Sequence, residues 1–144
     1  RIINIGSVLG FMAMPHMALY AATKHAIEGY SESLDHELRT MGIRVSVIEP
    51  AFMKTAIDAN SRDADAKLDA YRDVRIAMDR RLKEMLEVAE APDVVADTVL
   101  KAASAASPKA RYTAGTAAAR LRLMHTLLPA SLLDAGIRKQ LRIA

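Results

Sequence analysis

A serine, a tyrosine and a lysine near the start of the chain have the types and spacing needed for proton transfer. Ser7 closes an apolar run, Tyr20 follows it in the sequence, and Lys24 comes one helical turn after Tyr20. On a helix, the i, i+4 spacing puts Tyr20 and Lys24 on one face. An ammonium group beside a phenol favours the phenolate, so Tyr20 could give or take a proton near neutral pH. The Ser7 hydroxyl could donate a hydrogen bond to a carbonyl oxygen that gains charge. The three side chains therefore suit reversible proton transfer between an alcohol and a carbonyl. A cofactor must carry the hydride, because no side chain supplies one.

The segments that carry these residues predict a strand, a helix and a second strand. Arg1–Ser7 is an Ile-rich run typical of a strand buried on both faces. Apolar residues at helical spacing predict a helix over residues 18–41, which stops at Gly42. Ile43–Ile48 is β-branched and predicts a second buried strand, broken by the Glu-Pro pair that follows. Strands joined in this way are parallel, and ligands bind outside the carboxyl ends of such strands.

The segments IINIGSVLG, YAATKHAIEGYSESL and GIRVSVIEPAFMKT resemble the catalytic core of the short-chain dehydrogenase/reductase family. The resemblance is close over residues 1–58 and looser over residues 92–116. The chain also looks similar to the retinol and hydroxysteroid dehydrogenase-like members of the family. It implies an α/β fold: the C-terminal part of a Rossmann-type doubly wound parallel sheet, with the N-terminal dinucleotide-binding strands absent from the chain. By resemblance, Ser7 polarises the substrate carbonyl and Tyr20 is the acid/base. Lys24 would bind the nicotinamide ribose and make the phenol easier to ionise.

The resemblance also implies that NAD or NADP is the cofactor, and that an alcohol and a carbonyl on an apolar small-molecule substrate are interconverted. The family usually has glycine where this chain has Ala51. The glycine-rich fingerprint and the residue that selects between the two cofactors belong upstream, so the choice between them stays open. Besides Tyr20 and Lys24, the residues expected at the cofactor are Pro50, Ala51, Met53 and Thr55.

The loop before the predicted helix supplies the candidate substrate contacts Leu9, Met14 and His16. These residues either line an apolar pocket or only pack against their neighbours. Residues 59–90 are expected to form a substrate lid, by resemblance, or a plain pair of surface helices. No metal site is expected, because the histidines show no ligand spacing and the chain has no cysteine.

The rest of the chain, residues 91–144, predicts a helix that opens at Pro92, a short strand within residues 108–116, and a helical tail with breaks at Pro129 and Gly136. Residues 101–144 carry eight basic side chains and one acidic one. This tail could lie on a membrane surface, but a helix that covers the core or a neighbouring subunit is the more common case.

Composition and resemblance together give the expected setting and partners. The chain has 144 residues, 51% of them apolar, which predicts a folded domain. The absence of cysteine fits a reducing compartment, so the expected location is the cytoplasm. No nucleic acid partner is expected. The helix over residues 18–41 is expected to pair with its copy in a homo-oligomer. We also expect the N-terminal half of the same protein to be required for a working site. The alternative function is that of a non-catalytic binding or scaffold protein of the same fold.

Overall fold

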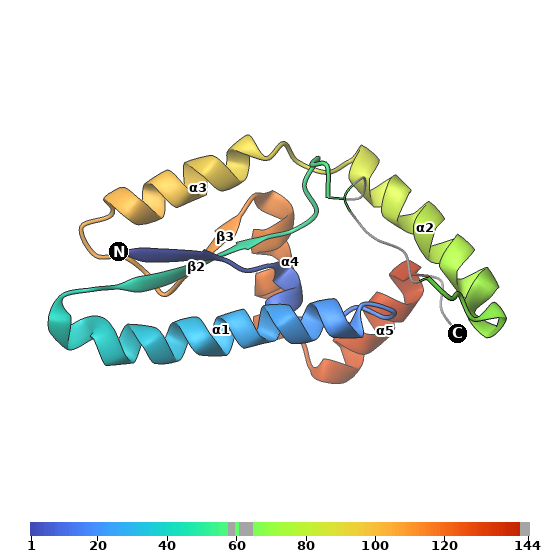
Figure 1. Cartoon of the computed structure of the whole chain (residues 1–144), viewed down its shortest axis with the longest axis horizontal. Coiled ribbons are helices and arrows are strands. Elements are labelled where there is room, and N and C mark those ends of the chain that lie inside the picture. Colours follow the sequence, from blue (N-terminus) through green and yellow to red (C-terminus); the bar gives the residue numbers. More distant parts are fainter. Residues whose placement is uncertain (58–59, 61–64, 142–144) are drawn as a thin grey trace.

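The computed structural model describes residues 1–57, 60 and 65–141. Three parallel strands form one sheet in the order β1 (Ile2–Ile5), β2 (Val45–Pro50) and β3 (Arg111–Ala114). Helix α1 (Ala18–Leu38) covers one face of the sheet, and α3 (Asp93–Ser104) covers the other (Figure 1). The predicted α/β class and the parallel strand–helix–strand unit are therefore confirmed.

Helix α1 starts at the predicted residue and ends at Leu38, three residues before the predicted end at Met41. A 3-10 turn over Arg39–Met41 follows it, and Gly42 adopts the left-handed conformation with φ 72° that stops the helix. Asp35 in the last turn is buried, and its carboxylate accepts hydrogen bonds from the Val45 N–H at 2.8 Å and the Arg44 Nε at 2.8 Å. This carboxylate fixes the first residue of β2 against the end of α1.

Two predictions about the strands are wrong in detail. Glu49 and Pro50 do not break the second strand, because both pair with β3 and β2 runs through them. The first strand is not buried on both faces: Ile2 is 36% and Ile5 45% exposed. Among the described residues β1 has a strand neighbour on one side only, so it is an edge of this sheet.

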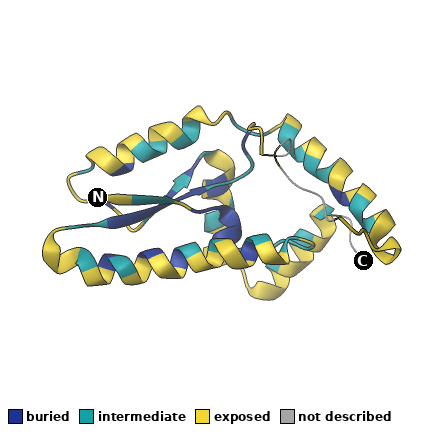
Figure 2. Cartoon of the chain, viewed as in Figure 1, coloured by how far each residue is buried: buried dark blue, intermediate teal, exposed yellow. Residues whose placement is uncertain are grey.

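The core of the described residues consists of two clusters. One lies between the sheet and α3 and contains Ile48, Tyr112, Ala114 and Ala102. The other lies where the 3-10 turn Val8–Gly10 meets helix α4 (Thr116–Leu127). In Figure 2 most of β2 and the 3-10 turn Val8–Gly10 are dark, whereas β1 and the outer sides of the helices are mostly exposed or intermediate. The second cluster brings the C-terminal part of the chain against the segment that follows Ser7.

The segment between β2 and α3 forms a 3-10 turn over Asp69–Tyr71 and helix α2 (Arg72–Glu87). Met78 is the single buried residue of α2, and its other side chains are largely exposed (Figure 2). The role of residues 59–90 as a lid stays a prediction. Residues 58–59 and 61–64, which belong to this segment, lie outside the described residues.

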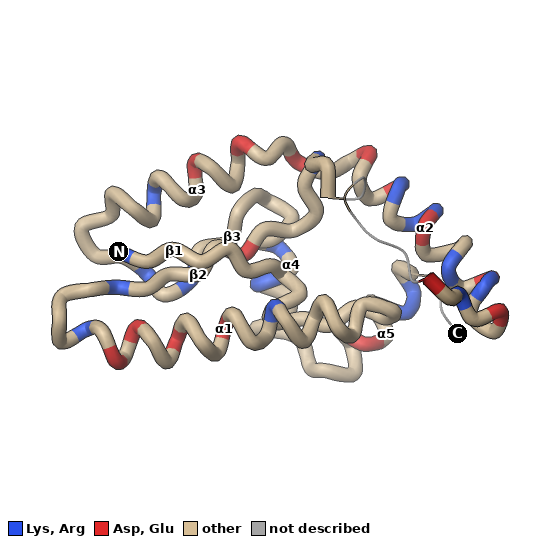
Figure 3. Tube along the Cα trace, viewed as in Figure 1, with Lys and Arg blue, Asp and Glu red and all other residues tan. Residues whose placement is uncertain are grey.

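The tail is helical and breaks at Pro129, as the sequence predicts. Helix α5 (Ala130–Leu141) follows, and Gly136 lies inside it, so the break expected at Gly136 is wrong. Helix α5 has no buried residue. Figure 3 shows that charged residues lie mainly on the helices, with both signs along α2. None of the described helices is both long and apolar enough to cross a membrane.

Candidate active site

Ser7 lies just beyond the carboxyl end of β1, in a position that fixes its hydroxyl. The residue is 7% exposed, and its Oγ accepts a hydrogen bond of 3.1 Å from the Leu9 N–H, which caps the 3-10 turn Val8–Gly10. The preceding Gly6 continues the strand pairing through a bond to the Ile48 carbonyl, and a Cβ there would lie 2.7 Å from a Val47 methyl. Since the Ser7 oxygen accepts from backbone, the hydroxyl hydrogen stays available for donation to a ligand.

Tyr20 and Lys24 lie in the first turns of α1, on the side that meets this turn. Tyr20 is half-buried and packs against the cluster of Val8, Leu9 and Ala118. The Lys24 Nζ lies 5.6 Å from the centre of the Tyr20 ring and donates a hydrogen bond of 3.2 Å to the Ile5 carbonyl. Partial burial lowers the pKa of the Lys24 ammonium group.

The structure therefore brings Ser7, Tyr20 and Lys24 to one end of β1. Lys24 binds the carbonyl of the last β1 residue, Ser7 follows that residue by two positions, and Tyr20 packs on the turn that Ser7 caps. This is the carboxyl end of a parallel strand, where ligands bind in sheets of this type. An ammonium group has three N–H bonds, so Lys24 can donate to ligand hydroxyls while it holds the Ile5 carbonyl.

The other residues expected at the cofactor lie at the carboxyl end of β2 and just beyond it, at the same end of the sheet. Pro50 is the last residue of β2, and Met53 is 9% exposed. Ala51 packs against the cluster of Val8, Leu9 and Ala118, as Tyr20 does. Met53 forms a parallel bridge with Glu90, and the Glu90 carbonyl accepts from the Lys54 N–H at 3.0 Å. This pairing with Glu90 fixes the backbone of Met53 and Lys54, in the segment Pro50–Thr55.

Thr55 is exposed two residues beyond Met53. Ala51 stands where the family usually has glycine. Among the described non-glycine residues only His16 has a left-handed φ, so the φ of Ala51 is not left-handed. Ala51 therefore fits this position without backbone strain.

The three candidate substrate contacts take two different places. Leu9 and Met14 belong to the cluster around Tyr20, with Leu9 only 4% exposed, so they pack near the site. His16 is exposed, has φ 63°, and lies with Met17 at a cleft of about 360 Å³ against α2. A volume of this size can hold a small molecule. From α2 and the turn before it, the cleft is lined by Tyr71, Val74, Arg75, Met78, Asp79 and Leu82.

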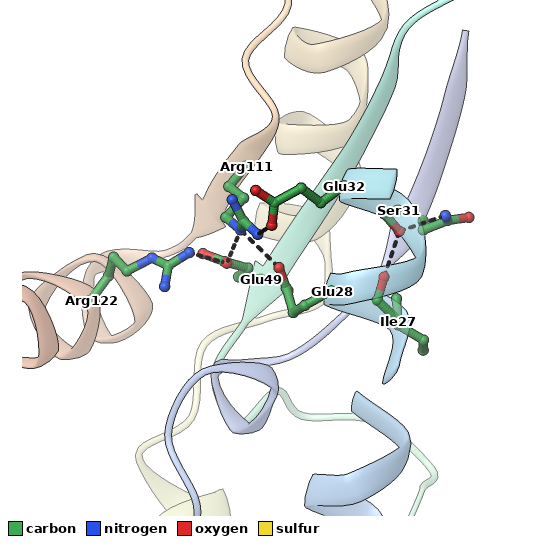
Figure 4. Close-up of polar contacts among 8 residues, drawn as sticks. Ile27, Glu28, Ser31, Glu32, Glu49, Arg111 and Arg122 are labelled. Carbon is green, nitrogen blue, oxygen red and sulfur yellow. Dashed lines mark hydrogen bonds and ion pairs between the residues drawn. The ribbon is translucent and has the colours of Figure 1, made fainter. Parts of the chain in front are cut away.

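The sequence did not predict one feature beside the candidate site, a cluster of charged side chains around the buried Glu49. Glu49 is completely buried, and its Oε1 lies 2.6 Å from the Arg122 Nη2 and 3.8 Å from the Arg111 Nε (Figure 4). Arg111 also binds Glu28 at 2.9 Å and Glu32 at 2.7 Å, both on α1. A glutamate that extends a β-branched strand run could have signalled a buried ion pair, but the sequence does not show which arginines pair with it.

Burial raises the pKa of Glu49 to about 7. The Arg122 and Arg111 guanidinium groups oppose this rise, and the neighbouring Glu28 carboxylate adds to it. Glu49 therefore changes its charge near neutral pH, one residue before Pro50 and the segment expected to contact the cofactor.

The sequence and the fold of the chain are both similar to those of known proteins. A family profile described as short chain dehydrogenase matches residues 1–66. The NADPH-dependent 3-dehydrocapnine reductase of Ornithobacterium rhinotracheale is 30% identical over 144 residues, which cover 99% of this chain and 51% of that protein. The chain belongs to the short-chain dehydrogenase/reductase family.

Two further matches describe its relation to other members of the short-chain dehydrogenase/reductase family. Human retinol dehydrogenase 16 is 30% identical, with 94% of this chain and 46% of that protein covered. A crystal structure of a short-chain dehydrogenase/reductase from Burkholderia phymatum in complex with NAD is 28% identical, with a TM-score of 0.65 and coverage of 87% of this chain and 46% of that chain. The chain spans about half the length of the curated relatives it matches.

Proposed function

We propose that the protein of which this chain forms a part is an NAD(P)-dependent oxidoreductase that interconverts an alcohol and a carbonyl. The observation that carries the proposal is that Ser7, Tyr20 and Lys24 meet at the carboxyl end of β1, each held by a contact of its own. The relatives named NADPH-dependent 3-dehydrocapnine reductase and retinol dehydrogenase, and the neighbour in complex with NAD, support it.

The three side chains divide the work according to their chemistry. Tyr20 gives or takes the proton at the substrate oxygen, and Ser7 donates a hydrogen bond to that oxygen while negative charge develops on it. Lys24, whose Nζ lies 5.6 Å from the centre of the Tyr20 ring, would hold the ribose hydroxyls of the nucleotide. When bound, the nicotinamide supplies or accepts the hydride.

The segment Pro50–Thr55 fits one side of a nicotinamide ring in this scheme. Its backbone is fixed at Met53 and Lys54 by Glu90, and Thr55 is exposed with a hydroxyl that can bind an amide. Fixed backbone groups bind a ligand with little loss of entropy. We therefore assign Met53 and Thr55 to the carboxamide, and Pro50 and Ala51 to the packing behind it.

The cleft between His16 and α2 supports an apolar substrate. Its apolar side chains Met17, Val74, Met78 and Leu82 come from both sides, and it lies beside the segment that joins Ser7 to Tyr20. We propose that α2 lies over the bound substrate and that His16 contacts it.

An upstream segment completes the site in this proposal. The free edge of β1 exposes Ile2 and Ile5, which an additional parallel strand would cover. Co-expression of this chain with the upstream portion of the same protein tests the requirement. Turnover and NAD(P)H binding by residues 1–144 alone would contradict it.

Self-association through α1 is part of the same proposal. The outer face of α1 exposes apolar side chains, with Leu19 86% and Tyr30 62% exposed. We expect Tyr30→Glu to shift the complete protein to a smaller species in sedimentation velocity. An unchanged sedimentation coefficient would exclude this face as the interface.

The catalytic roles are tested with Tyr20→Phe in the complete protein, against Tyr30→Phe on the exposed face of the same helix. The assay follows NAD(P)H absorbance with a series of apolar secondary alcohols and their ketones. Loss of the acid/base should lower kcat by about 10² to 10⁴ while nucleotide binding persists. Tyr30→Phe should leave kcat unchanged, and a Tyr20→Phe variant with parental kcat would remove Tyr20 from its role.

A further inference from the structure

We propose that Arg122, on the C-terminal helix α4, is a positioning residue that ties the segment after Ser7 to the strand end that leads into the segment Pro50–Thr55. This inference rests on the proposed oxidoreductase function and deepens it. Arg122 touches neither Ser7 nor the segment Pro50–Thr55 directly; it acts through Glu49 and Phe11, which belong to the two sides of the site.

The first contact is with Glu49. The Arg122 Nη2 lies 2.6 Å from the Glu49 Oε1, and Glu49 is 0% exposed. A carboxylate buried to this extent needs a cationic or hydrogen-bonding partner. Losing the contact would leave a buried charge unpaired, so Arg122 is held close to Glu49. Glu49 directly precedes Pro50, the last residue of β2. Figure 4 shows the Arg122 side chain reaching from α4 to the Glu49 carboxylate.

The second contact is with Phe11. The guanidinium carbon of Arg122 lies 4.2 Å from the centre of the Phe11 ring, within the range of a cation–π interaction. His125, one turn further along α4, meets the same ring edge-on with 5.3 Å between the ring centres. Phe11 closes the 3-10 turn that Ser7 caps, and its N–H donates to the Val8 carbonyl at 3.3 Å. Two α4 side chains thus hold the far end of the turn that begins at Ser7.

The chemistry of arginine explains how one side chain makes both contacts. A guanidinium group is planar, so it donates to a carboxylate in its plane while its face covers an aromatic ring. A lysine ammonium in the same place could pair with Glu49, but it has no planar group that could stack on Phe11 at the same time. Lysine should therefore weaken the Phe11 contact more than the Glu49 contact.

A variant that lacks the Arg122 guanidinium group still has Arg111 beside Glu49, so we expect it to fold. The Arg111 Nε lies 3.8 Å from the Glu49 Oε1, so the buried carboxylate keeps a guanidinium group nearby when Arg122 is changed. Arg120 provides the matched control, because it lies on the same helix two residues earlier and is exposed. On a helix, a separation of two residues puts these arginines on opposite sides.

The experiment compares Arg122→Met, Arg122→Lys and Arg120→Met in the complete protein. Amide hydrogen exchange at Phe11 and Met12, whose N–H groups both bond the Val8 carbonyl, reports the order of the turn whether or not the protein has the proposed activity. We expect Arg122→Met to speed this exchange at least tenfold, Arg122→Lys to speed it less, and Arg120→Met to leave it unchanged. Parental exchange in Arg122→Met would overturn the proposal.

Kinetics separate positioning from general stabilisation. We expect Arg122→Met to lower kcat about tenfold with little change in the KM of either substrate, and Arg122→Lys to restore part of the loss. Equal losses in Arg122→Met and Arg120→Met would contradict the proposal. If the proposed function fails because Tyr20→Phe is fully active, the exchange result still decides the role of Arg122.

A second variant covers the case in which Arg122→Met does not fold. Phe11→Leu keeps an apolar side chain but removes the ring, and Glu49 keeps its partner. We expect Phe11→Leu to speed exchange at Met12, and the addition of Arg122→Lys to cause little further change, because the ring that Arg122 covers is already gone. Exchange effects that simply add in the double variant would show that Arg122 does not act through Phe11.

Discussion

The buried Glu49 should make the stability of the protein fall as the pH rises toward and through neutrality. Burial raises the pKa of Glu49 from 4.5 to about 7, so the folded state holds the proton more tightly than the unfolded state. Proton binding therefore favours folding. This contribution is fully present below the unfolded value of 4.5 and is lost as the pH passes through about 7. Arg122 and Arg111 face the carboxylate from α4 and β3, and Glu28 faces it from α1.

The size of the effect follows from the two pKa values. The interval from 4.5 to about 7 corresponds to an upper value of about 3 kcal/mol in the free energy of unfolding, at roughly 1.4 kcal/mol for each pKa unit. Glu49→Gln keeps the side-chain shape and an oxygen for Arg122 but cannot titrate. We expect the variant to lose much less stability than the parent between pH 5 and pH 8, and to be the more stable of the two above pH 7.

Urea unfolding of the complete protein, measured by circular dichroism at several pH values, gives the free energy of unfolding for both proteins. Glu37→Gln, an exposed position on α1, is the matched control and should follow the parent. All other ionisable groups are common to the parent and to Glu49→Gln, so the difference between their curves isolates Glu49. Parallel curves for the parent and Glu49→Gln would refute the assignment of a raised pKa to this carboxyl.

Two further predictions concern the connection between α1 and β2. Asp35→Asn should lower the free energy of unfolding by about 3 kcal/mol in urea titrations. The substitution removes the negative charge that pairs with Arg44 and accepts the hydrogen bond of the Val45 N–H. A change below about 1 kcal/mol would contradict this role. Gly42→Ala should lower the free energy of unfolding by about 1 kcal/mol, because φ is 72° there, while Gly42→Asn should cost less, since asparagine tolerates this conformation; equal costs would argue against the backbone as the cause.

The sequence was sufficient to predict that the three candidate catalytic residues lie close together. Ser7 lies two residues beyond the end of a strand, and Tyr20 and Lys24 lie on the next helix along the chain. The end of the strand and the period of the helix therefore place all three together. The stop at Gly42 and the break at Pro129 were also predictable, because each depends on the conformational preference of a single residue.

The ion pairs around Glu49 could not be predicted in this way. Glu49 and Pro50 suggested the end of a strand, because a charge and a missing N–H both disfavour a central one. They stay in β2 because Arg122, which is distant in the sequence, neutralises the glutamate from α4, and because Pro50 is the last residue of the strand. Contacts between residues so far apart depend on how the helices pack on the sheet, which no local pattern contains.

The exposed edge of β1 has a similar explanation. An Ile-rich run predicts a strand with apolar neighbours on both faces, but burial depends on which elements cover it. Among the described residues only β2 pairs with β1, so Ile2 and Ile5 stay exposed. Their apolar character agrees with the proposal that an upstream strand of the same protein covers this edge.

The most direct test of the proposed site is whether Ser7 and Tyr20 act as one unit at the end of β1. The measurement is kcat for Ser7→Ala, Tyr20→Phe and the double variant of the complete protein, with NAD(P)H turnover as the signal. Groups that act on the same proton transfer are strongly non-additive, so the double variant should be about as slow as the slower single variant. Losses that multiply in the double variant, or single variants with parental kcat, would contradict the account.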